Sequence, residues 1–68
     1  MNDETLNMST RKLLKTVGIA SQREIEHAVE RAIASGAIKG TETFHATMTL
    51  EIAGLKLNVV HKGDISLE

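Results

Sequence analysis

The chain contains no cysteine, proline, tryptophan or tyrosine, and Phe44 is its only aromatic residue. The absence of cysteine excludes disulfides and thiolate metal sites, which fits a reducing compartment. Single-strand nucleic-acid binders stack bases on aromatic side chains, and tight protein interfaces are enriched in Trp and Tyr. Neither means of recognition is available to this chain.

The chain also lacks a large net charge and a long apolar run. Eight basic and nine acidic side chains give a net charge of −1, so no global attraction draws the protein to nucleic acid or to an anionic membrane. Residues 1–4 do not resemble a secretory signal, and no stretch approaches the ~20 apolar residues that span a bilayer. We expect a cytoplasmic protein of one small domain, residues 1–68, with a thin core.

A stripe of side chains at helical spacing begins near the N-terminus. Its members are Leu6, Thr10, Leu13, Leu14 and Val17. This spacing predicts a helix over about 3–17. Gly18 would end that helix as a left-handed residue.

A second helix is predicted from a capping box and a longer apolar stripe. Ser21 and Glu24 have the spacing at which each side chain satisfies a free backbone N–H of the first turn. The stripe consists of Ile25, Ala28, Val29, Ala32 and Ile33. It predicts a helix over about 21–35 that Gly36 ends. Because only residues 18–20 separate the two helices, we expect a helix–turn–helix or αα-hairpin.

From Thr43 onward the apolar period changes to two. Alternation predicts a half-buried strand over about 43–52 and a second strand over about 55–61. A two-residue loop at Ala53-Gly54 would join them, with a longer, bulged loop as the alternative.

The two-residue loop fixes a register for this hairpin. It pairs Ile52 with Leu55 on the apolar face and Glu51 with Lys56 on the polar face, so like residues fall together. Further along, Gly63-Asp64 predicts a turn, after which residues 64–67 form a short third strand or a tail. That strand would place Ile65 and Leu67 on the polar face, which conflicts with a simple meander.

These elements predict an α+β fold of two layers in the order ααββ. The helix–turn–helix pair packs on the β-hairpin, because neither part can bury its apolar stripe alone. A short third C-terminal strand is the variant of this architecture.

No catalytic residue, cofactor or metal site is predicted. His27, His45 and His61 do not converge in the predicted register, so a zinc site with three histidine ligands is not expected. Ser21 has a structural role as a cap, and neither a G-x-S-x-G elbow nor a phosphate-binding glycine loop occurs. We therefore expect that the protein is not an enzyme.

Four basic residues form a candidate patch for phosphates or for a partner: Arg11, Lys12, Lys15 and Lys39. Cations near the C-terminal end of the first predicted helix also complement its dipole, which explains three of them without a ligand.

Nucleic-acid binding is one functional hypothesis. Two helices, a turn containing glycine and a hairpin look like a reduced winged helix–turn–helix, whose second helix would enter the major groove. The exposed side chains of the second helix sum to −1, however, and phosphates repel such a face. The turn is also one residue longer than usual, and the third helix of a winged helix is missing.

Self-association, or protein interaction more generally, is the hypothesis that we favour. A two-stranded hairpin leaves two open edges that invite another strand. The strand over 43–52 is long, lacks proline and carries few charges. Pairing with a second copy through this hairpin edge would enlarge a thin core, although a short strand over 65–67 could cover an edge instead.

Six short motifs spread over most of the chain carry a resemblance to a known family. They are Asn7-Met8-Ser9, Arg11-Lys12-Leu13-Leu14-Lys15, Val17-Gly18-Ile19, Ser21-Gln22-Arg23-Glu24-Ile25-Glu26, Ser35-Gly36 and Met48-Thr49-Leu50. They resemble a family of short bacterial proteins known only as a domain of unknown function. The resemblance implies a bacterial source and a single-domain protein of about this length, and it carries over no activity, ligand or site residue.

Overall fold

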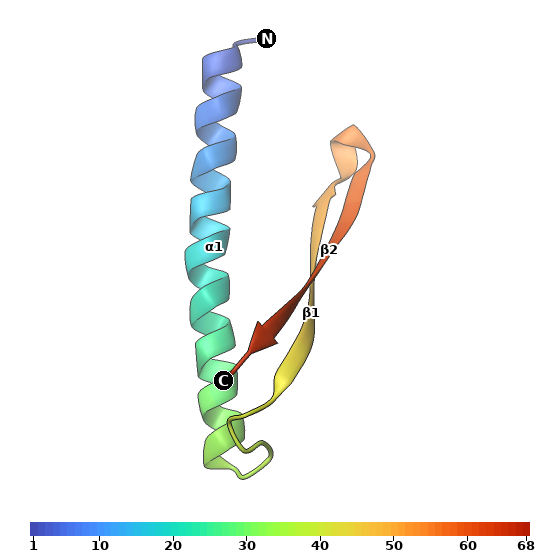
Figure 1. Cartoon of the computed structure of the whole chain (residues 1–68). Helices are drawn as coiled ribbons and strands as arrows, with labels where there is room; N and C mark the ends of the chain where they lie inside the picture. Colours follow the sequence, from blue (N-terminus) through green and yellow to red (C-terminus); the bar gives the residue numbers. More distant parts are fainter. The chain divides into compact units, whose positions relative to one another are not determined.

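A computed structural model describes all residues, 1–68, and contains one long helix and one hairpin. The elements are α1 (Asp3–Ala34), β1 (Thr43–Ile52), the 3-10 turn η1 (Ala53–Leu55) and β2 (Leu57–Ser66), as Figure 1 shows. The predicted α+β class is confirmed. The chain divides into two units, Met1–Ser35 and Gly36–Glu68, and each is described by itself.

Helix α1 runs without a break through Gly18, so the prediction of two helices separated by a turn at residues 18–20 is wrong. Glycine in a helix interior costs about 1 kcal/mol relative to alanine, which is too little to stop a helix that continues for several turns on both sides. Ser21 and Glu24 are therefore interior residues and not a capping box. The helix–turn–helix on which the nucleic-acid hypothesis depended is absent.

The apolar pattern explains why the helix continues. Positions separated by steps of four, four and three residues form one stripe through the whole element. We define the helix stripe as Leu6, Thr10, Leu14, Val17, Ser21, Ile25, Ala28 and Ala32. A repeat of eleven residues in three turns corresponds to 3.67 residues per turn, close to the 3.6 of an α-helix. The stripe therefore stays on one face across Gly18.

Both ends of α1 are capped. The Asn2 side chain accepts a hydrogen bond of 3.0 Å from the backbone N–H of Thr5, and Asp3 and Glu4 occupy the first turn, where negative charge is favoured. At the other end Gly36 has a φ of 78°. Glycine adopts this left-handed conformation at no steric cost, so the predicted stop at Gly36 is confirmed.

The hairpin has the predicted first strand, but its second strand spans Leu57–Ser66 instead of about 55–61, and the register differs. Ile52 pairs with Leu57, and Glu51 pairs with Asn58, two positions away from the predicted partners Leu55 and Lys56. The loop is longer than two residues because η1 is followed by Lys56 in the left-handed region, with a φ of 53°. A shift of two leaves every side chain on its predicted face, since the side-chain period of a strand is two.

Strand β2 continues through Gly63, so the predicted turn at Gly63-Asp64 and the separate third strand are wrong. Ile65 pairs with Phe44 in the same ladder. This places Ile65 on the apolar face, whereas the predicted third strand would have placed it on the polar face. The backbone N–H of Leu67 then donates to the carbonyl oxygen of Glu42 at 3.0 Å, which closes the base of the hairpin.

No residue of the chain is buried. A single helix and a single two-stranded sheet each present one apolar side, and neither element alone can surround a side chain. No helix of the structure combines the length and the apolar character that a membrane span requires.

Candidate interaction surface

One face of the hairpin is almost entirely apolar. We define the apolar hairpin face by five cross-strand pairs: Phe44–Ile65, Ala46–Gly63, Met48–His61, Leu50–Val59 and Ile52–Leu57. Met48 near its centre is 48% exposed. Cross-strand contacts between these aliphatic and aromatic side chains stabilise the hairpin, but their outer surfaces remain open to water. A face of this kind is suited to contact another polypeptide.

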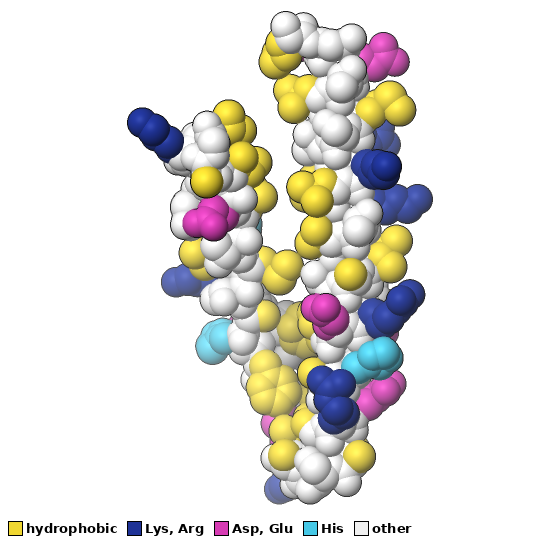
Figure 2. Space-filling model, turned by 180° about the vertical axis from the view of Figure 1, so that it is seen from behind, with side chains coloured by type: hydrophobic (Ala, Val, Ile, Leu, Met, Phe, Trp, Pro, Cys, Tyr) yellow, Lys and Arg dark blue, Asp and Glu magenta, His cyan; other side chains and the backbone are white.

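The helix stripe is the second apolar surface of the chain. Leu6 is 52% exposed and Leu14 is 57% exposed. Figure 2 shows hydrophobic side chains at the surface of both units of the chain. Contiguous exposed apolar surface of this kind is a candidate for interaction.

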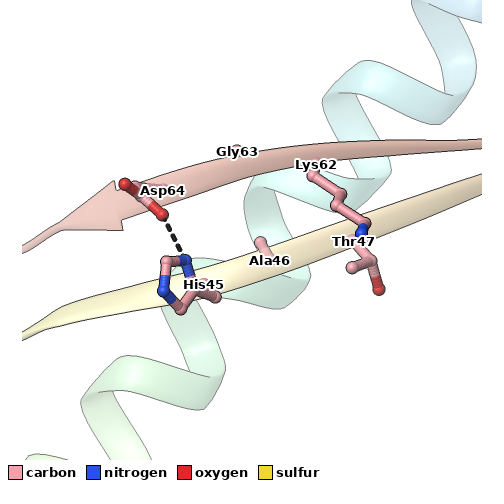
Figure 3. A pocket seen from close by; sticks show the side chains of 6 residues that line it. All are labelled: His45, Ala46, Thr47, Lys62, Gly63 and Asp64. Atoms are coloured by element: carbon pink, nitrogen blue, oxygen red, sulfur yellow. Dashed lines mark hydrogen bonds and ion pairs between the residues drawn. The ribbon is translucent and has the colours of Figure 1, made fainter.

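The polar face of the hairpin carries a histidine–carboxylate pair. His45 on β1 lies opposite Asp64 on β2, and its Nδ1 is 2.7 Å from Asp64 Oδ1 (Figure 3). An ionised carboxylate only accepts hydrogen bonds, so Nδ1 carries the proton and donates. The two side chains are 95% and 56% exposed. The pair is therefore a surface contact, of a kind that contributes about 0–1 kcal/mol.

An open hollow lies beside this pair. It is lined by His45, Ala46, Thr47, Lys62, Gly63 and Asp64 (Figure 3). Thr47 contributes a hydroxyl to this lining, and the hydroxyls of Thr43 and Ser66 hydrogen-bond to each other at 3.3 Å. No nucleophile is hydrogen-bonded to His45, so the hollow lacks the nucleophile–base–carboxylate arrangement of a hydrolytic site.

The other two histidines lie elsewhere. His61 belongs to the apolar hairpin face, on the opposite side of the sheet from His45, as the alternation predicted. His27 lies on α1. No group of three metal-ligating side chains gathers anywhere in the structure.

The predicted basic patch does not form one surface within either unit. Arg11, Lys12 and Lys15 lie close together on α1, outside the helix stripe. Lys39 lies in the other unit, in the loop before β1. Its backbone N–H donates to Glu42 Oε2 at 2.9 Å, so this residue has a structural role through its main chain.

The sequence did not reveal the role of Glu42. Its carboxylate accepts backbone hydrogen bonds from Lys39 and Gly40, both 2.9 Å, and from Thr41, 3.0 Å. These donors, Lys39 first, lower the pKa of Glu42 below its usual value. The only signal available was a glutamate just after the glycine of a loop, which is too common to single out. Glu42 holds the loop that leads into the hairpin.

Comparison with known proteins places the chain in a family. No curated protein and no solved structure matches it. One family model matches residues 1–68, which is the whole of the sequence. The chain belongs to that family, the family of unknown function DUF6494.

Proposed function

We propose that the protein is a self-association module, a small interaction protein whose apolar surfaces are covered when two copies join. The observation that carries this proposal is that no residue is buried although many large apolar side chains are present. A protein of this size needs a disulfide, a metal or an oligomer interface to supplement a small core. With no cysteine and no cluster of metal ligands, an interface supports the fold best.

The lengths of the two elements support the same proposal. Helix α1 has 32 residues, and at 1.5 Å per residue it is about 48 Å long. Each strand has ten residues and spans roughly 33 Å. The helix stripe, from Leu6 to Ala32, is about 39 Å long, so it exceeds the strands by about 6 Å. That part of the stripe is left for another molecule.

The backbone of the hairpin offers a further contact. The sheet has two strands, so both are edge strands with unpaired backbone groups. An interface formed by these edges and by apolar faces performs no chemistry, and the His45–Asp64 pair stands in open solvent. We propose a binding function without enzymatic activity.

Urea unfolding at different protein concentrations tests this proposal. Far-UV circular dichroism follows the helix, since the chain has no Trp or Tyr to report by fluorescence. If folding and dimerisation are coupled, raising the concentration 100-fold stabilises the dimer by about 2.7 kcal/mol, and the midpoint moves to higher urea. A midpoint that stays constant over this range would show that a single chain is folded by itself, and the proposal would be wrong.

A further inference from the structure

The helix stripe has nearly the same spacing when it is read in either direction. The eight members of the stripe form four pairs, and the two residue numbers in each pair sum to 38 or 39. These pairs are Leu6 with Ala32, Thr10 with Ala28, Leu14 with Ile25, and Val17 with Ser21. We propose that two copies associate through α1 as an antiparallel helix pair centred near Ile19. This inference rests on the proposed self-association and names its surface and geometry.

The sizes of the paired side chains favour this direction. In three of the four antiparallel pairs a larger residue meets a smaller one, as where Leu6 faces Ala32, and only Leu14 and Ile25 are both large. Alternating large and small residues across facing positions fills the space between two helices evenly. A parallel pair would set Leu6 against Leu6 at one end and Ala32 against Ala32 at the other, and helices held apart by leucine would leave a void between alanines.

Charge along α1 favours the same direction. The segment 11–15 carries three positive charges and no negative charge, whereas the segment 23–31 carries three negative and two positive charges. An antiparallel pair brings each basic segment beside the mixed, net acidic segment of the partner copy. A parallel pair would instead stack the basic segments on each other.

Gly18 fits the centre of such a pair. It lies in the middle of a 32-residue helix, where glycine is unfavourable. A methyl group added to it meets no atom of this chain within 4 Å, so packing within one chain does not require glycine. Near the centre of an antiparallel pair, Gly18, Ala20 and Ser21 are all small and allow two helix backbones to approach closely.

Cross-linking of single-cysteine variants tests the direction, and the natural chain has no cysteine to interfere. Leu6→Cys and Ala32→Cys chains are mixed in equal amounts and treated with a short bismaleimide, because paired helix axes lie about 8–10 Å apart. Met8→Cys and Glu30→Cys chains are the matched control. Their positions also sum to 38 but lie on the face opposite the stripe. Mass spectrometry distinguishes mixed from like dimers.

We expect the mixed Leu6→Cys/Ala32→Cys dimer to form at least fivefold more than the mixed control dimer. Dominant cross-linking of Leu6→Cys chains with one another would overturn the antiparallel pair, because those positions lie roughly 39 Å apart in it. A protein that is dimeric by light scattering but cross-links equally in both mixtures associates elsewhere, for example through the hairpin edge. That outcome overturns this inference and leaves the proposed function intact, whereas a monomer overturns both.

Discussion

At the scale of single residues, Glu42 is the side chain with the most defined surroundings. Three backbone N–H groups point at its carboxylate, and they favour its charged form. Since the folded-state pKa is lowered, this contribution to stability is present above the usual pKa of a glutamate. It is lost as the pH falls through the lower, folded-state pKa.

A carbon-detected NMR titration of the Glu42 carboxyl group checks this contribution. We expect a midpoint below the ordinary value of 4.5. As the group protonates, or in the Glu42→Gln variant at neutral pH, the amides of Lys39 and Gly40 should exchange with solvent faster. A midpoint at or above 4.5 would show that the loop does not hold the carboxylate in this way.

At the scale of elements, two of the predictions that failed treated a glycine as the end of an element. The first helix was expected to be ended by Gly18, and the second strand, over about 55–61, to be followed by a turn at Gly63-Asp64, yet both elements continue. In each case the apolar pattern stays in phase across the glycine: the eleven-residue repeat passes Gly18, and the alternation of two passes Gly63. The pattern was the stronger signal, because the cost of one glycine is small beside that of ending an element.

Other features of the elements followed directly from the sequence. Strand β1 has the predicted bounds, residues 43–52, and Gly36 ends α1 where the apolar stripe also ends. The sequence left two lengths open for the hairpin loop. Loops of two and of four residues leave the same side chains on the apolar face, so periodicity alone could not choose between them. The position of Glu42 depends on main-chain geometry, which no pattern of side chains encodes.

Two substitutions of Gly18 should have opposite effects: alanine should stabilise the helix, and leucine should weaken the dimer. Gly18→Ala should stabilise the isolated helix by about 1 kcal/mol, because alanine is the better helix former and its methyl group meets no atom of the chain. This gain is read as ellipticity at 222 nm below the dimer dissociation concentration. Gly18→Leu should raise the dimer dissociation constant at least tenfold, because its bulk separates the helices where they come closest.

The control for this pair of variants is Lys12→Leu, which adds the same side chain on the face opposite the helix stripe. It should leave the dissociation constant within about threefold of the natural value. If Gly18→Leu dimerises as tightly as Lys12→Leu, then the centre of α1 is not a place where two backbones meet.

At the scale of the whole molecule, the α+β class was predictable because two apolar periods follow one another along the chain. The predicted helix–turn–helix is absent from the structure, because its evidence was a turn at residues 18–20 that the structure does not contain. What the sequence did contain is many large apolar side chains, none of which is buried in the structure. The central claim is therefore that a second copy supplies the cover.

Light scattering during size-exclusion chromatography tests this claim most directly. At high micromolar concentration we predict a molar mass of twice the 7.4 kDa chain, falling toward the monomer on dilution as mass action requires. A single peak at 7.4 kDa over the whole concentration range would contradict the claim.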